Sequence, residues 1–445
     1  MCTTVAAMAL VYRRAWPTPR EAVLAVISIA CIVIVIRLAS RVIRIGATLT
    51  WILALFVLHT PTPPRSVGYD FGTFYSGAIL LFERQVSPYS FSGTTAFPFP
   101  SFPIVWLLSL TGRLPESQTF LNLLAVEILL LTLAWCLVRR IRLRKTLDPS
   151  MDTPLSLLEA AFLLHPAIIG GLLLGNTAAL AGSLLALAVW CWRTLSGRSA
   201  EHAAAILLCL ACMLKPQLLM VAAFFLLNWV LGVWRRAHQP LALTARIGAL
   251  LVPWWFLLVL LSVPLAHQGF LRAYLEFPGV AARWHTVIAE LYQNNYAPPA
   301  ILAKAAARFW PISVSTLLPF LTLGLASLVV SWNVTATLRG APDTILAFLP
   351  WVMSSLLWTS LVWEWYLSLV VVGLLLLPYW CLTSTGSASP ATALLLGAGI
   401  GLTMVFSSFL FMLGVLLLYF LGHHLRAVEV ASSSVDRRSP PESVW

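Results

Sequence analysis

Charge is what this chain has least of, and acidic charge above all. Only 10% of its 445 residues are charged and 16 are Asp or Glu, whereas 60% are hydrophobic. Roughly a quarter of the residues in a soluble globular domain are charged, so this composition excludes an ordinary soluble protein. Ionised groups beside lipid are costly unless they face water or a partner. Each carboxylate near an apolar stretch is therefore a candidate functional group.

Several motifs of known enzymes are also missing. The sequence contains no Asp-x-Asp pair for a metal-bound nucleotide sugar, no Walker loop, no Gly-rich dinucleotide turn and no His-Glu-x-x-His. A group donor, if the protein uses one, is therefore expected to be a lipid-linked molecule that already resides in the bilayer. The seven cysteines lie mostly in or beside apolar stretches, which favours packing, and Cys209-x-x-Cys212 is a weak signal for a zinc or redox site.

Long apolar stretches are what the chain has in abundance. About 20 apolar residues span a bilayer as a helix, and about ten to thirteen such stretches occur. Nothing shows the alternating pattern of a barrel, so the sequence predicts an all-α polytopic membrane protein. The candidate spans lie near residues 21–36, 45–60, 117–138, 154–174, 177–192, 203–214, 217–234, 247–264, 309–332, 343–360, 364–382 and 391–421, the last long enough for two short helices.

The formal net charge of +12 could indicate a nucleic-acid partner, but the arginines cluster at the ends of apolar stretches. They are therefore interpreted as topology signals, and no nucleic acid is expected. Placing these clusters in the cytoplasm puts residues 61–116 and 265–308 outside. Residues 1–44 are interpreted as an N-terminal anchor with a basic segment, a cleaved signal peptide being the alternative. Residues 426–445 are expected to form a disordered cytoplasmic tail.

The first outer segment contains Asp70 among aromatic residues that include Tyr69 and Tyr75. Apolar residues recur with helical spacing over 72–83, which predicts an amphipathic helix on the outer membrane surface. Asp70 then stands near the N-terminus of this helix. It is either a helix cap or a functional carboxylate.

The second outer segment is rich in hydrogen-bonding side chains. These could form the wall of a pocket for a polyhydroxy compound, and a merely solvated loop has the same composition. The residues are Arg272, Glu276, Arg283, His285, Glu290, Gln293, Asn294 and Asn295.

Two polar interruptions lie inside apolar runs. Lys215, followed by Pro216, requires a water-filled cavity or an anionic partner such as a lipid phosphate, unless its side chain reaches the interface. The run from Gly170 to Asn176, which follows His165, predicts a tight turn between short helices at the outer face.

A late motif, Trp363-Glu364-Trp365-Tyr366, lies between two apolar spans. Tryptophans at such a position are usually interfacial anchors. Glu364 has no such explanation and is a candidate functional acid.

In this order, the motifs resemble the GT-C superfamily of lipid-phosphosugar glycosyltransferases, and family 87 most closely, over about residues 40–385. The matching features are Asp70-Phe71 with Phe74-Tyr75, Pro88-Tyr89, Phe99-Pro100 to Leu108, Gly175-Asn176, Lys215-Pro216 and Trp363 to Tyr366. Departures at Ala178, Trp365 and Asn294-Asn295-Tyr296 bear on the identity of the sugar or acceptor.

The resemblance implies a GT-C-like transmembrane catalytic domain over 45–425 in the bacterial plasma membrane. It implies inverting transfer of a sugar, with mannose as the family's usual sugar and a pentose as the alternative, from a polyprenyl-phosphate donor to a glycolipid or glycan acceptor. No metal or cofactor beyond the lipid co-substrate is implied. Asp70 would be the general base. The substrate-binding residues would be Tyr69, Tyr75, His165, Asn176, Lys215, Arg272, Arg283, His285, Asn295, Glu364 and Tyr366.

Two other functions stay open. One is a transporter or flippase for lipid-linked sugars. Acids buried in the middle of spans would favour it, whereas this chain is expected to have its acids mainly in loops. The other is a non-catalytic subunit of an envelope-synthesis complex. In every case membrane lipids surround the chain.

Overall fold

The described part of the chain is entirely helical where it is regular. The computed structural model describes residues 19–37, 41–58, 69–82, 84, 86–87, 114–143, 149–235, 242–291, 295, 297–339, 344–359, 362, 364–383, 389–404 and 408–436. Sixteen α-helices and two 3-10 helices lie within these residues. The expectation of an all-α protein is confirmed for this part of the chain.

The helices follow one another with short connections. They are α2 (Pro19–Arg37), α3 (Arg41–Leu58), α4 (Tyr69–Phe82), α6 (Glu116–Leu143), α7 (Pro149–Leu163), α8 (Pro166–Leu174), α9 (Ala178–Thr194), α10 (Arg198–Leu214), η2 (Pro216–Leu218), α11 (Leu219–Arg235), α12 (Leu243–Leu291), α13 (Pro298–Phe309), α14 (Val314–Leu338), α15 (Ile345–Ser354), η3 (Glu364–Val370), α16 (Val371–Thr383), α17 (Pro390–Thr403) and α18 (Ser408–Asp436).

Six of these segments, as described, are long and apolar enough to cross a membrane: Glu116–Ile141, Leu155–Leu174, Pro216–Trp234, Leu243–Ser262, Val314–Leu338 and Phe409–Ala431. Shorter apolar helices accompany them, among them most of α2, α9 and α17. This supports a multi-pass membrane protein. The count of ten to thirteen spans stays a prediction.

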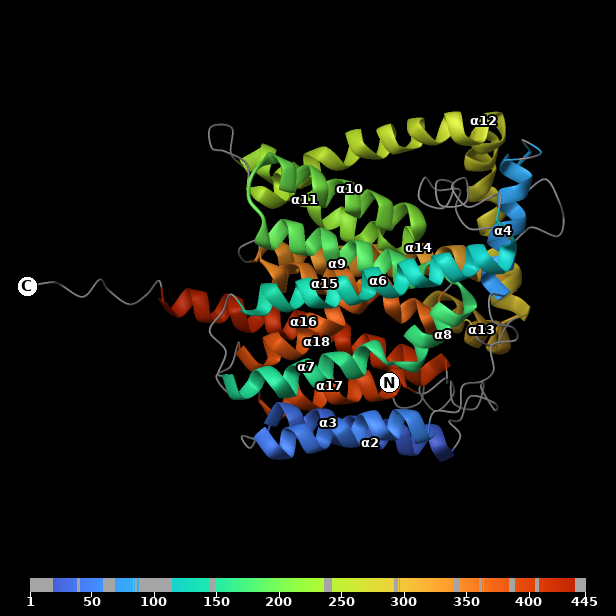
Figure 1. Cartoon of the computed structure of the whole chain (residues 1–445). Coiled ribbons are helices and arrows are strands. Elements are labelled where there is room, and N and C mark those ends of the chain that lie inside the picture. Colours follow the sequence, from blue (N-terminus) through green and yellow to red (C-terminus); the bar gives the residue numbers. More distant parts are fainter. Residues whose placement is uncertain are drawn as a thin grey trace, which may run out of the picture.

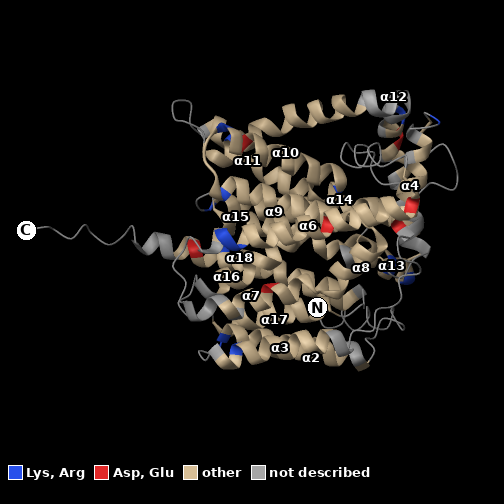
Figure 2. Cartoon of the chain, in the orientation of Figure 1, with Lys and Arg blue, Asp and Glu red and all other residues tan. Residues whose placement is uncertain are grey.

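Most helices lie side by side, with their axes aligned along the same direction of the bundle (Figure 1). Lys and Arg are most frequent at one end of the bundle (Figure 2). At this end α2 connects to α3, and α10 and α11 lie beside the start of α12. The opposite end carries α4, the turn between α8 and α9, and α13, and α4 lies across it (Figure 1). Most of the described basic residues thus gather at one end of the bundle, and α4, the later part of α12 and α13, which belong to the predicted outer segments, lie at the other.

Helix α9 forms the centre of the core. All but a few of its residues are buried between α6, α10 and η3. At Gly182 a Cβ atom would lie 1.9 Å from the backbone oxygen of Ser368, so a glycine is needed where α9 meets η3. This contact brings the late 3-10 helix against the middle of the chain.

The structure differs from the sequence interpretation in the second outer segment. Residues 265–291, expected as a loop, belong to α12, which is 49 residues long. At the end that carries α4 the helix bends and continues across the bundle beside α4 (Figure 1). It contains Pro253, Pro264 and Pro278, and prolines remove the helical hydrogen bonds whose loss permits such a bend.

Two further expectations need correction. The acids are not mainly in loops, because twelve of the 16 lie in described helices, and among these Glu127 in α6 and Glu159 in α7 are buried. The segment expected as a disordered tail begins inside α18, which continues to Asp436. The amphipathic helix over 72–83 and the division of 391–421 into two helices are confirmed as helices α4, α17 and α18.

Candidate functional site

The candidate site includes the turn between α8 and α9. Helix α8 ends at Leu174, and Gly175 follows with φ 71° and ψ 32° while its N–H binds the carbonyls of Gly171 and Leu172. This left-handed conformation favours glycine. A Cβ atom at Gly175 would also lie 2.6 Å from the Cβ of Phe71, so the missing side chain lets the first turn of α4 rest on this turn.

Asn176, the next residue, joins this turn to α4. Its Oδ1 accepts a hydrogen bond from the backbone N–H of Ala178 at 3.1 Å, and its Nδ2 donates to Oδ2 of Asp70 at 2.8 Å. The first bond fixes the orientation of the amide, so that the NH₂ group faces the carboxylate. Two residues that are 106 positions apart in the sequence thus come into contact.

Asp70 lies in the first turn of α4, where Phe71 and Phe74 are buried against the bundle. Within the described residues, its carboxylate accepts the bond from Asn176 and none from the backbone of α4. The helix-cap interpretation therefore has no hydrogen bond to support it there. Burial raises the pKa of Asp70, and the bond from Asn176 and the charge of Lys215 only partly offset this rise.

Lys215 stands at the break between α10 and η2. Its backbone is extended (φ −139°, ψ 98°), and Pro216 begins η2, so the predicted division into two helical segments is confirmed. The residue is only 6% exposed. Its Nζ lies 4.6 Å from the ring centroid of Tyr366 and makes no side-chain hydrogen bond in the described part of the chain.

The charge of Lys215 is opposed by two acids. Burial lowers the pKa of its ammonium group, and the carboxylates of Asp70 and Glu127 act in the opposite direction. Any anion that approaches Lys215 therefore competes with these carboxylates for its charge.

Glu127 is the member of the cluster that the sequence analysis missed. It is 0% exposed, and neither carboxylate oxygen has a hydrogen-bond partner within the described residues. The backbone N–H of Leu180 acts on it electrostatically without the geometry of a hydrogen bond. The signal was present in the sequence, because Glu127 is the one acid inside the apolar run 117–138.

Of the predicted site residues, the structure brings together Asp70, Asn176, Lys215 and Tyr366. Tyr75 lies on α4 too, but its hydroxyl donates to the Leu114 carbonyl at 2.9 Å. Its ring contacts Phe71. Tyr75 therefore ties α4 to the start of α6.

Two other predicted residues, His165 and Asn295, make different contacts. His165 caps α8 by accepting from the Ala167 N–H through Nδ1, and its Nε2 meets the Thr403 hydroxyl. Asn295 accepts the backbone N–H groups of Ala297 and Val362, which joins the segment before α13 to the segment before η3.

Arg272 is largely exposed on α12 and binds Glu276 at 2.8 Å. Glu276 also accepts from the Ser87 hydroxyl, and these bonds lower its pKa. Arg272 therefore lies outside the buried cluster. The side chains of four further predicted residues fall outside the described ones: Tyr69, Arg283, His285 and Glu364.

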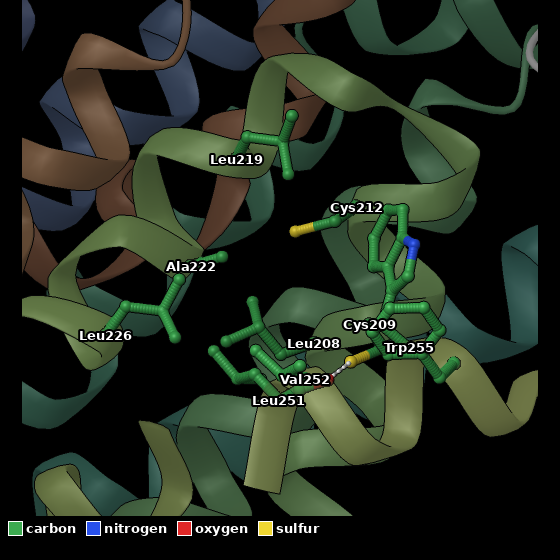
Figure 3. Close-up of a pocket in the computed structure, with 10 residues that line it drawn as sticks. Leu208, Cys209, Cys212, Leu219, Ala222, Leu226, Leu251, Val252 and Trp255 are labelled. Carbon is green, nitrogen blue, oxygen red and sulfur yellow. Dashed lines mark hydrogen bonds between the residues drawn. The ribbon is translucent and has the colours of Figure 1, made fainter. Parts of the chain in front are cut away.

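An apolar pocket of about 260 Å³ lies between α10, α11 and α12 (Figure 3). It includes Cys212 and Leu219, which stand three and four residues from Lys215 in the sequence. The exposed side chains of Val252 and Phe256 border it, so it opens on the outside of the bundle. Its lining suits a hydrocarbon chain, because apart from the two thiols and the indole of Trp255 the side chains around it are pure hydrocarbon.

The thiols of this pocket are engaged in packing. Cys209 donates to the carbonyl of Leu251 and Cys212 to that of Leu218, each at 3.4 Å. Among the described residues, no three His, Cys, Asp or Glu side chains gather closely enough to hold a metal ion.

Comparison with known proteins adds no relative. No family model matches the chain, and neither a curated protein nor a solved structure matches it.

Proposed function

We propose that the protein is a membrane glycosyltransferase that moves a sugar from a polyprenyl-phosphate donor to a glycolipid or glycan acceptor on the extracytoplasmic face. Mannose is the proposed sugar, and a GT-C-like bundle is the proposed fold. The proposal rests on the motif resemblance together with one observation. Asp70, Asn176, Lys215 and Tyr366, from four separate motifs of that resemblance, lie in one cluster.

In the proposed reaction Asp70 is the general base. The acceptor hydroxyl attacks the anomeric carbon from the face opposite the lipid phosphate, and its proton passes to the Asp70 carboxylate. The bond between the anomeric carbon and the phosphate oxygen breaks, and its electron pair leaves with the lipid phosphate. The configuration at the anomeric carbon is therefore inverted. General base assistance contributes about 10²–10⁴-fold to such a step.

The remaining residues of the cluster have supporting roles in this proposal. Asn176 orients the carboxylate through its hydrogen bond of 2.8 Å. Lys215 is the described cation that acts on Asp70, and it would bind the departing phosphate. The pocket between α10, α11 and α12 would hold part of a lipid chain.

A second candidate function is a transporter or flippase for a lipid-linked sugar. Glu127 favours it, because unpartnered acids inside membrane helices commonly belong to ion or substrate pathways. A transporter would move its substrate across the bilayer without forming a new glycosidic bond.

Mass analysis of membrane glycolipids in a strain that lacks the gene separates these functions. For the transferase we expect a glycolipid one sugar shorter to accumulate, and a plasmid copy of the wild-type gene to restore the longer species. For the transporter, the lipid-linked donor should instead accumulate on the cytoplasmic side. An unchanged glycolipid profile would contradict the proposed transfer.

A further inference from the structure

The connection between α13 and α14 is exposed over its whole length. Every residue from Arg308 to Ser313 is exposed, and two neighbours in this run are aromatic, Phe309 at 62% and Trp310 at 60%. The connection lies at the end of the bundle that carries α4 (Figure 1). Adjacent exposed side chains of this size form an apolar patch, and such patches commonly mark a surface that contacts a membrane or another molecule.

The exposed connection is held by ordered helix ends on both sides. Most residues of α13 up to Ala305 are buried, so this helix is packed against the bundle. The N–H of Trp310 donates to the carbonyl of Ala306 at 3.0 Å, which ends α13. The Ser313 hydroxyl caps α14 by accepting from the N–H of Thr316 at 3.2 Å. The aromatic side chains therefore project from a fixed position.

Helix α14 sets the depth of this connection in the bilayer. It is among the segments that can cross a membrane, and only 11% of its apolar stretch is buried inside the bundle. Its 25 residues extend about 37 Å at 1.5 Å per residue, which exceeds a hydrocarbon core of about 30 Å. No charged residue occurs between Arg308 and Arg339. An arginine on each side of an uncharged span indicates that both lie at the level of the lipid headgroups.

The charge of this surface is positive. The guanidinium group of Arg308 makes no hydrogen bond or ion pair within the described residues, whereas that of Arg272 on α12 is bound to Glu276 at 2.8 Å. Lys304 stands four residues before Arg308, which places both on the same side of α13. No acidic residue occurs from the start of α13 to Ser313. An anionic partner would therefore complement this surface.

We propose that Arg308, Phe309 and Trp310 bind the headgroup of an anionic phospholipid, in the leaflet at the end of the bundle that carries α4. The guanidinium group donates hydrogen bonds to the phosphate, and the rings pack against the glycerol and the upper part of the acyl chains. The run continues directly into the exposed face of α14, where Phe320 and Leu323 contact lipid in a spanning helix, so a phospholipid fits this surface better than a partner protein. The inference does not depend on the proposed transfer reaction.

Photo-crosslinking from a single position identifies the lipid that is bound there. The photoreactive amino acid p-benzoyl-phenylalanine replaces Phe309, and the purified protein is reconstituted into vesicles of phosphatidylcholine with a minor share of phosphatidylglycerol. Mass spectrometry of the crosslinked peptide then identifies the lipid. The matched control has the same amino acid in place of Phe320, which is 72% exposed and lies within the uncharged part of α14.

We expect phosphatidylglycerol to be enriched about fivefold over its share of the vesicle at position 309, because one basic side chain favours an anionic membrane surface by about this factor. At position 320 the crosslinked lipid should match the composition of the vesicle. Arg308→Gln should remove most of the enrichment at position 309. Arg272→Gln, which removes an exposed arginine that is already paired with Glu276, should leave it unchanged.

Equal shares of phosphatidylglycerol at positions 309 and 320 would overturn the proposal, and so would an enrichment that persists in Arg308→Gln. The same probe in intact cells tests for another occupant, and crosslinking to a protein in place of phospholipid would also overturn the proposal. Should the probe at Phe309 not yield folded protein, its placement at Trp310, which is equally exposed, gives the same decision.

Discussion

Two buried polar clusters in this bundle differ in how completely their hydrogen bonds are formed. In the first, Asn333 of α14 accepts from the hydroxyl of Tyr419 at 3.0 Å and contacts His423 at 3.1 Å, and its NH₂ donates to Ser354 at 3.1 Å. In the second, Asn176 and Asp70 are bonded, but the Lys215 ammonium and the Glu127 carboxylate have no hydrogen bond within the described residues.

The difference indicates different roles. The amide of Asn333 has partners on both its oxygen and its nitrogen from α15 and α18, so this cluster fastens helices together. The Asp70 cluster keeps charged groups in an apolar interior with hydrogen-bonding capacity left over, which costs stability. Groups held at such a cost are commonly those that bind or react.

The largest difference between the effect on transfer and the effect on stability is expected from Lys215→Met. We expect sugar transfer in isolated membranes to fall by about 10²–10³-fold, the effect of removing one electrostatic contact to a developing charge. The thermal unfolding temperature in detergent should change little, because the loss of a buried cation without hydrogen bonds is offset by the loss of its charge beside Asp70 and Glu127. A large loss of stability with transfer preserved would contradict this account, because Lys215 would then stabilise the fold as Asn333 does.

Gly175→Ala should act on the geometry of the Asp70 cluster. A Cβ atom there meets the Cβ of Phe71 at 2.6 Å, and φ is 71°. We expect a loss of about 1–3 kcal/mol in the free energy of unfolding, together with weaker transfer because α4 is displaced. Gly170→Ala is the matched control, because no atom from outside its own helix turn lies within 4 Å of its Cβ position, and it should leave transfer unchanged without lowering the free energy of unfolding.

Asn333→Ala should show the opposite behaviour to Lys215→Met. Removal of the amide leaves Tyr419 and Ser354 without this partner, and we expect a loss of about 1–2 kcal/mol in the free energy of unfolding. Transfer per folded molecule should be unchanged. Unfolding curves and transfer assays on the same preparation measure both, and a selective loss of transfer would erase the distinction between the clusters.

The smallest expected effect is a shift in the pH dependence of transfer. A base is active only when deprotonated, so activity should fall as the pH drops through the pKa of Asp70, which is raised above its ordinary value. Asn176→Ala removes a hydrogen bond that lowers this pKa, so the acid limb should move to higher pH. An acid limb that stays in place would show that Asp70 is not the group whose protonation lowers transfer.

Local features of the sequence were enough to predict the helix breaks of the site. Pro216 cannot continue a helix, and Gly175 suits a left-handed turn, so both breaks follow from neighbouring residues. The contact between Asp70 and Asn176 depends instead on tertiary packing over 106 positions, and only the motif resemblance placed these residues in one site.

Other features could not be predicted from a local pattern. Residues 265–291 are polar enough to suggest a loop, yet they continue α12 because helical hydrogen bonds satisfy their backbone whether or not the segment lies in lipid. The imidazole of His165 resembled a binding group, but it caps α8 and meets Thr403 on α17. Such a partner, 238 positions away, is visible only in the folded chain.

The most direct test of the central claim is sugar transfer by purified protein in lipid vesicles, supplied with labelled polyprenyl-phosphate mannose and a glycolipid acceptor. The comparison is between the wild type and Asp70→Asn, which keeps the shape of the side chain and an oxygen for Asn176. We expect product from the wild type, and transfer at least 100-fold slower from a variant with the same unfolding temperature. Wild-type turnover in Asp70→Asn would contradict the account.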